Sequence, residues 1–63
     1  MIDFNEFAKD LKKYLQSLGF ISVATDGQTN YFYDKDDLFC INYEYKSVWY
    51  RESNTAKWSK LND

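Results

Sequence analysis

Residues 3–33 decide the fold, and they read DFNEFAKDLKKYLQSLGFISVATDGQTNYFY. In the first half of this stretch apolar residues recur every three or four positions, which is the period of a helix with one apolar face. From residue 20 onward apolar and polar residues tend to alternate, which is the period of a β-strand. The change of period around Gly19 predicts an N-terminal helix followed by strands.

The predicted helix spans residues 3–18, and its start and end signals agree with its apolar stripe. Asp3 is the expected N-cap, because its carboxylate can accept a free N–H of the first turn, and Glu6 completes a capping-box pair. Ile2 and Phe7 occupy the two positions of a hydrophobic staple. Gly19 follows the helix, where a left-handed residue is favoured. The stripe itself consists of Phe4, Phe7, Ala8, Leu11, Tyr14, Leu15 and Leu18.

The first predicted hairpin turns at Asp26-Gly27. This dipeptide favours a two-residue type I′ turn, which needs positive φ at both central positions. Such a turn places Ile21 opposite Phe32, with strands over residues 20–25 and 28–34. The residues expected to face the helix are then Ile21, Val23 and Phe32, and those expected to face away are Phe20, Ser22, Ala24, Tyr31 and Tyr33.

The second half of the chain predicts two further strands and leaves one segment undecided. The strands are residues 38–45 and about 48–52, preceded by the polar connection 34–37 and separated by a turn near Lys46-Ser47. Residues 55–61 fit either a short fifth strand or a helical turn. Alternation assigns Phe39, Ile41, Tyr43, Tyr45, Val48 and Tyr50 to the helix side, and Leu38, Cys40, Asn42, Glu44, Trp49 and Arg51 to the other side.

These elements predict a single α+β domain over residues 1–63, with the amphipathic helix packed on one face of a four- to five-stranded antiparallel β-meander. The helix must bury its stripe, and the sheet is its only partner. Hydrophobic residues make up 44% of the chain and aromatic residues 21%, which favours a packed core over disorder. Because one helix covers only one face, we expect the other face of the sheet to remain uncovered.

The composition argues against catalysis and against a bound cofactor or metal ion. The chain has no histidine, which is the commonest general base and metal ligand. Its two glycines, Gly19 and Gly27, form no phosphate-binding loop. Cys40 lies in mid-strand and is expected to be inert, while residues 34–37 contain only fragments of a calcium loop. The sequence therefore predicts a non-enzymatic protein without cofactor or metal.

Charge and cysteine content restrict the class of partner and the cellular compartment. The net charge of −2 and the pI of about 4.9 differ from those of a typical nucleic-acid-binding domain. The single cysteine indicates a reducing compartment, no apolar run is long enough for a membrane span, and the N-terminus does not resemble a signal peptide. We therefore expect a soluble, cytoplasmic protein with no membrane partner.

The uncovered face of the sheet is the leading candidate site. It would display Tyr31, Tyr33, Trp49 and Arg51, residue types that are enriched at protein interfaces. An ordinary amphipathic sheet surface is the opposing interpretation, since tyrosine is also a good strand former. The leading hypothesis is a protein-binding module, such as a phage or mobile-element inhibitor or adaptor that occludes its partner. Self-association into a structural homodimer is an alternative.

The basic C-terminal part is a second candidate site. Residues 46–63 carry a net charge of +2, with aromatic residues between the cations. Single-stranded nucleic-acid sites combine stacking platforms with cations, so Lys46, Lys57, Trp58 and Lys60 could form such a site beside Trp49 and Arg51. Phosphate binding needs several cations on one face, however, and an exposed edge strand protected by lysines explains the same residues. Nucleic-acid binding is therefore the second hypothesis.

Overall fold

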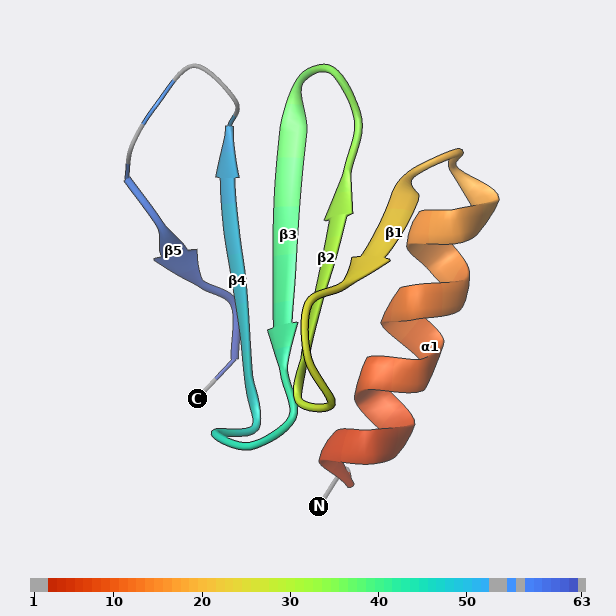
Figure 1. Ribbon diagram of the computed structural model, residues 1–63, viewed down its shortest axis with the longest axis vertical. Coiled ribbons are helices and arrows are strands. Elements are labelled where there is room, and N and C mark those ends of the chain that lie inside the picture. Colours follow the sequence, from red (N-terminus) through yellow and green to blue (C-terminus); the bar gives the residue numbers. More distant parts are fainter. Residues whose placement is uncertain (1–2, 53–54, 56, 63) are drawn as a thin grey trace.

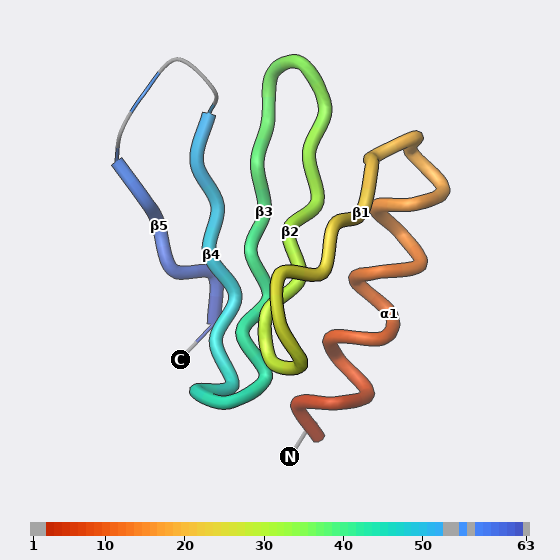
Figure 2. The backbone as a smooth tube through the Cα atoms, viewed as in Figure 1, coloured from red at the N-terminus to blue at the C-terminus, as the bar shows by residue number. Residues whose placement is uncertain are grey.

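The computed structural model describes residues 3–52, 55 and 57–62, and it confirms the predicted α+β architecture. Helix α1 (Phe4–Ser17) precedes a five-stranded antiparallel sheet in which each strand pairs with the next one in sequence (Figure 1). The tube in Figure 2 shows short turns joining the first four strands, so the sheet is a simple open meander. Its strands are β1 (Ile21–Ala24), β2 (Thr29–Tyr33), β3 (Asp37–Asn42), β4 (Ser47–Glu52) and β5 (Ser59–Lys60).

The start of α1 follows the sequence prediction. The Asp3 side chain accepts a hydrogen bond from the Glu6 backbone N–H at 3.3 Å, which identifies Asp3 as the N-cap. An N-cap of this kind stabilises a helix by about 1 kcal/mol. The predicted staple involves Ile2, which lies outside the described residues.

The end of α1 also follows the prediction. Gly19 has φ +94°, a left-handed conformation that favours glycine. Its N–H donates to the Gln16 carbonyl, and the Phe20 N–H donates to the Leu15 carbonyl, each at 3.1 Å. These two bonds form a Schellman motif, which satisfies carbonyls at the helix end and turns the chain toward β1.

The core lies between α1 and one face of the sheet. Its fully buried side chains are Ala8, Leu15, Phe32, Ile41 and Val48, surrounded by the partly buried Phe4, Phe7, Leu11, Phe20, Phe39 and Tyr43. Aromatic contacts contribute to this core: the ring centroid of Phe4 in α1 lies 6.1 Å from that of Tyr43, and the ring centroid of Phe20, just before β1, lies 5.6 Å from that of Phe39 in β3. Such edge-to-face pairs add to the stability gained by burial.

Two residues of the predicted stripe lie outside this core. Tyr14 is 61% exposed and Leu18 is 58% exposed. Tyr14 lies about 100° around the helix axis from the buried Leu15, and so on the flank of the stripe. Leu18 is the C-cap, beyond the last helical turn that packs on the sheet.

The first hairpin differs from the prediction by one residue. Its turn contains residues 26–28 rather than Asp26-Gly27 alone, with the Thr25 N–H donating to the Thr29 carbonyl at 3.1 Å. The Asp26 carboxylate accepts the N–H groups of Gln28 and Thr29 at 2.7 and 2.9 Å. An aspartate that binds the backbone ahead of it stabilises a different turn from type I′.

This one-residue difference reverses the faces of β1, because successive strand residues point to opposite sides. Ile21 pairs with Tyr33 and Val23 pairs with Tyr31, so the prediction that Ile21 and Val23 face the helix is wrong. They are 55% and 42% exposed, and the helix side carries Phe20, Ser22 and Ala24, which were expected to face away. The assignment of β2 is confirmed, since Phe32 is fully buried and both tyrosines face away from α1.

The hairpin between β3 and β4 is also longer than predicted, but its faces are unchanged. Residues 43–46 form a four-residue turn in which Lys46 has φ +52° and the Tyr45 N–H donates to Asn42 Oδ1 at 2.8 Å. The turn gains two residues, an even number, so Val48 lies on the helix side as predicted, although its buried side chain is opposite Ile41. Tyr45 leaves the sheet and is exposed, contrary to its predicted place on the helix side.

The undecided C-terminal segment contains the two-residue strand β5 (Ser59–Lys60). Ser59 pairs with Tyr50 and Lys60 with Trp49. The Leu61 N–H donates to the Val48 carbonyl at 2.8 Å. The Asn62 side chain extends this edge by accepting the Val48 N–H at 2.7 Å and donating to the Lys46 carbonyl at 3.0 Å.

Candidate functional site

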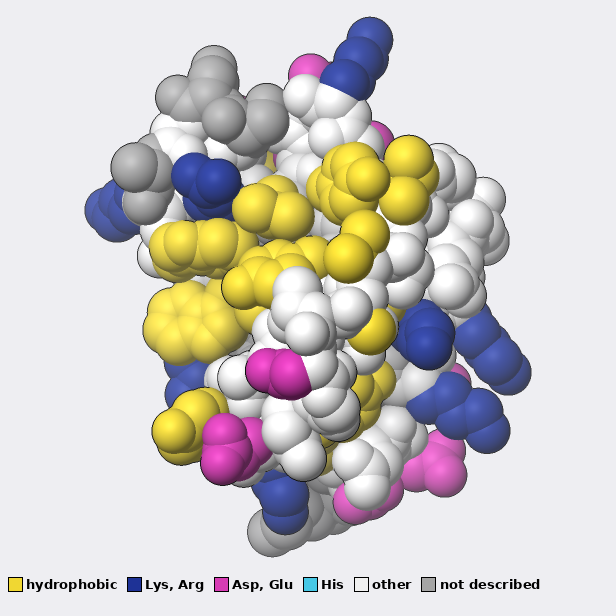
Figure 3. Space-filling view, viewed as in Figure 1, with side chains coloured by type: hydrophobic (Ala, Val, Ile, Leu, Met, Phe, Trp, Pro, Cys, Tyr) yellow, Lys and Arg dark blue, Asp and Glu magenta, His cyan; other side chains and the backbone are white. Residues whose placement is uncertain are grey.

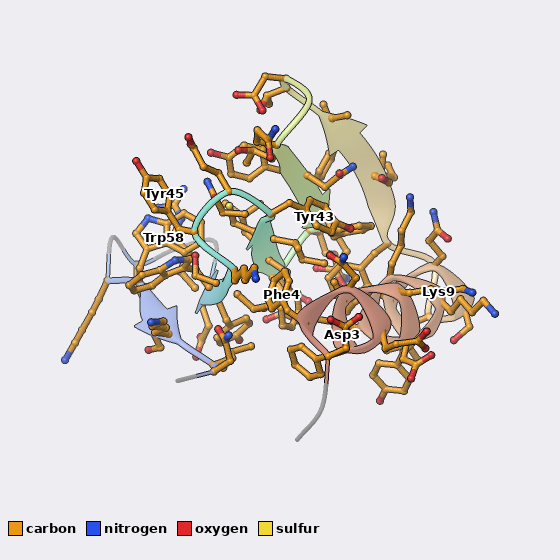
Figure 4. The ribbon with its side chains drawn as sticks, turned by 90° about the horizontal axis from the view of Figure 1, so that it is seen from below. Asp3, Phe4, Lys9, Tyr43, Tyr45 and Trp58 are labelled. Atoms are coloured by element: carbon orange, nitrogen blue, oxygen red, sulfur yellow. The ribbon has the colours of Figure 1, made fainter. Side chains whose placement is uncertain are left out.

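The sheet face opposite α1 carries most of the aromatic and apolar side chains that the core leaves out. We call this surface the far face. Figure 3 shows hydrophobic side chains gathered in a band that crosses it from the β5 side toward β1, and Figure 4 shows Tyr45 and Trp58 on the side of the sheet away from α1. Its members are Ile21, Val23, Tyr31, Tyr33, Leu38, Cys40, Trp49, Arg51, Trp58 and Lys60.

A hollow opens near the middle of the far face. Tyr31, Cys40 and Trp49 are consecutive cross-strand partners on β2, β3 and β4, and Trp58 completes the lining. The hollow has a volume of about 330 Å³ and opens widely to solvent. This volume is at the lower end of the range of about 300–1,000 Å³ that ligand pockets occupy. The hollow is large enough for one large side chain or a small ligand.

Two contacts hold the indole rings of the hollow. The Trp49 Nε1–H donates to Ser47 Oγ at 3.1 Å, and Ser47 is itself buried. The Arg51 guanidinium carbon lies 5.2 Å from the centre of the Trp58 ring, within the range of a cation–π interaction. The Arg51 Nη1 also donates to the Thr55 carbonyl at 2.9 Å, which ties the segment before β5 to β4. Contacts within the chain thus hold both indole rings of the hollow in place.

The floor of the hollow is uncharged at neutral pH. Burial raises the pKa of the Cys40 thiol above its ordinary value, and a hydrogen bond with Tyr31 only partly opposes this effect. The pKa of Tyr31 is raised as well, first by the charge that an ionised Cys40 would carry and then by burial. Because the protonated thiol is the less reactive form, this environment agrees with the expectation that Cys40 is inert.

Only cations are found among the charged strand residues of the far face. Arg51 and Lys60 lie on it, and neither forms an ion pair with another residue in the part of the chain that the structure describes. The Arg51 Nε is buried and has no hydrogen-bond partner there. Among the acidic residues, Asp26 and Glu44 lie in turns at the sheet end opposite Arg51, whereas Asp34, Asp36 and Asp37 lie at the same sheet end as Arg51.

The structure brings the two predicted site groups together. Tyr31, Tyr33, Trp49 and Arg51 share the far face, and Trp58 and Lys60 from the second group lie on the same surface. Lys46 lies in the turn between β3 and β4, and Lys57 precedes Trp58 without lining the hollow. The sequence interpretation missed Ile21 and Val23, because Asp26-Gly27 suggested the shorter turn. The carboxylate of Asp26, which can accept backbone N–H groups two and three residues later, was the available signal for the longer turn.

The acidic residues between β2 and β3 accept hydrogen bonds within the fold. Asp34 Oδ1 accepts the N–H groups of Asp36 and Asp37 at 2.8 and 2.7 Å. The Tyr50 hydroxyl donates to Asp37 Oδ1 at 2.7 Å, and this bond is the main reason why the pKa of Tyr50 is raised to about 12. No group of three or more histidine, cysteine or acidic side chains arranged for a metal ion occurs among the described residues.

Comparison with known proteins adds no functional assignment. No protein-family model matches the chain, and searches of curated proteins and of solved structures found no similar protein. Within the described residues, no helix is long and apolar enough to cross a membrane. The far face is therefore the feature of the molecule that bears on function.

Proposed function

We propose that this protein is a small non-enzymatic module that binds another protein through the far face and acts by occluding it, as an inhibitor or adaptor does. The observation that carries the proposal is the aromatic and aliphatic surface that α1 leaves uncovered on the sheet. We include a cytoplasmic setting in the proposal, because the single Cys40 then stays reduced.

The composition of the far face supports a protein partner. Aromatic and arginine side chains are enriched where proteins meet, because each combines a large contact area with a polar group. Trp49 and Tyr31 lie at the centre of the surface, where hot-spot residues usually occur. Ile21 and Val23 extend the surface over β1 with aliphatic side chains. Contiguous exposed apolar surface of this kind commonly marks an interaction site.

Single-stranded nucleic acid is the second candidate partner, because Trp58 and Lys60 lie beside Trp49 and Arg51 on one face. Indole rings can stack on bases, and the cations can contact phosphates. Two cations neutralise few phosphates, however, and the aliphatic side chains on β1 provide no stacking surface. The balance of residues on the far face thus favours protein.

Site-specific photocrosslinking tests the proposal. A benzophenone amino acid replaces the exposed Tyr33 on the far face in one variant and the exposed Tyr14 on α1 in the matched control. After irradiation of cells that carry the protein naturally, we expect a crosslinked partner protein from position 33 and none from position 14. Trp49→Ala added to the position 33 variant should lower the yield about tenfold, as the loss of a hot spot does.

Three outcomes would contradict the proposal. Equal crosslinking from both positions would show that the far face has no special role. A crosslinked product that nuclease removes would favour nucleic acid, and a product with twice the mass of this chain would favour the homodimer. Circular dichroism of the Trp49→Ala variant confirms that a lost crosslink does not result from unfolding.

A further inference from the structure

The charges on the far face differ from those of the whole chain. The chain has a net charge of −2, but the charged strand residues of the far face are Arg51 and Lys60, both cations. Each cation lies beside one indole ring of the hollow: Arg51 lies over the ring of Trp58, and Lys60 is the cross-strand partner of Trp49. A ligand in the hollow therefore meets positive charge on the indole side.

The hydrogen bonding of Arg51 also favours an anionic ligand. Its guanidinium donates to the Thr55 carbonyl, while its Nε is buried and lacks a hydrogen-bond partner among the described residues. A buried cationic N–H without a partner is costly, and a nearby anion lowers that cost by interacting with the whole guanidinium charge. The neutral floor formed by Tyr31 and Cys40 places no competing anion in the hollow.

These charges argue against a second copy of this chain as the occupant. Two far faces in contact would bring Arg51 and Lys60 of each copy against strands that carry no carboxylate on that side. Like charges in an apolar interface are strongly unfavourable, and unpaired ones are costly to desolvate. A partner that supplies carboxylates of its own is therefore a better occupant than a second copy of this chain.

We propose that the far face binds an acidic peptide segment of its partner, with one large apolar side chain in the hollow and flanking carboxylates on Arg51 and Lys60. This inference rests on the proposed function and specifies the chemistry of the partner. The carboxylates lie toward the β4–β5 side of the hollow, because Arg51 is on β4 and Lys60 is on β5.

Selection from a displayed library of random peptides tests the inference. Peptides enriched on the immobilised protein should contain an aromatic or large aliphatic residue flanked by aspartate or glutamate. The best selected peptide is then synthesised, and its affinity is measured by fluorescence anisotropy at low and at physiological salt. We expect affinity to fall at least fivefold as salt rises, because the ion pairs are partly exposed. In NMR spectra the indole N–H signals of Trp49 and Trp58 should shift on binding.

Two charge-matched double variants separate the local cations from the net charge. Arg51→Gln with Lys60→Gln should weaken binding of the synthetic peptide at least tenfold. Lys9→Gln with Lys13→Gln on the exposed side of α1 changes the net charge equally and should leave affinity within twofold; Figure 4 shows Lys9 pointing away from the sheet. Arg51→Lys retains the charge but not the planar fork, and it should have an intermediate effect. This variant also separates the charge from the packing of Arg51 on Trp58.

The outcomes distinguish this inference from the proposed function. Selected peptides that are neutral or basic, but lose binding in Trp49→Ala, would overturn the acidic partner and leave the far face as the docking surface. Selected peptides that bind Trp49→Ala unchanged would overturn both. Failure to enrich any acidic peptide would overturn the inference, with crosslinking at position 33 still deciding the proposed function. If a single-stranded oligonucleotide displaces every selected peptide, the acidic partner is overturned in favour of nucleic-acid binding.

Discussion

The two faces of this sheet are built from the same strands, yet they differ in almost every physical property. On the side of α1, Phe32, Ile41 and Val48 are completely buried. On the far face, their sequence neighbours Tyr33 and Trp49 remain in contact with solvent, and Tyr33 is 39% exposed. The helix thus covers one face of the sheet, and the apolar side chains of the other face lie outside the core.

The largest expected effect comes from truncating neighbouring residues on the two faces. Phe32→Ala removes a fully buried ring and should cost about 3–5 kcal/mol of unfolding free energy. Tyr33→Ala, on the exposed side, should cost about 1 kcal/mol or less. Urea denaturation followed by circular dichroism measures both. If Phe32→Ala does not fold at all, Ile41→Val should still lose about 0.5–1.5 kcal/mol. Equal losses at positions 32 and 33 would show that the two faces are packed alike.

A smaller effect is expected at the two glycines, each of which lies where the chain enters or leaves β1. Gly19 has φ +94°, so Gly19→Ala should destabilise the fold by about 1–2 kcal/mol although its Cβ would meet no atom within 4 Å. Gly27 has no positive φ and equally open surroundings, so Gly27→Ala should be neutral or stabilise by about 0.4–1 kcal/mol. Thermal unfolding of both variants gives the comparison. A marked loss at Gly27 would indicate the type I′ turn and the register that it implies.

The smallest expected effect concerns the pH dependence of the covered side. The hydrogen bond to Asp37 raises the pKa of Tyr50 to about 12 from its ordinary value of 10.0. A group whose pKa is raised on folding contributes stability that is complete below its unfolded pKa and is lost as pH rises through the folded value. The wild-type protein should therefore lose stability between about pH 10 and pH 12, and Tyr50→Phe should lose less over that window. Denaturation at pH 8 and pH 11.5 measures the difference, with Tyr14→Phe as the exposed control. Parallel losses in wild type and Tyr50→Phe would contradict this assignment.

The sequence alone determined the helix, the class of the fold and three of the five strands' faces. These features depend on local rules: Asp3 caps the helix, Gly19 ends it, and alternation along β2, β3 and β4 assigns Phe32, Ile41 and Val48 to the core. The candidate residues Tyr31, Tyr33, Trp49 and Arg51 followed from the same alternation, and they lie on the face that was expected.

The tertiary structure decided what local rules leave open. Asp26-Gly27 suits more than one turn, and the carboxylate contacts of Asp26 select the longer one, which sends Ile21 and Val23 to the far face. The short strand β5 exists because β4 offers it a partner, and only that pairing brings Trp58 over Tyr31, Cys40 and Trp49 and next to Arg51. Pairing partners far apart in the sequence, and the number of residues in a turn, are properties of the folded chain because they depend on which competing hydrogen bonds are satisfied together.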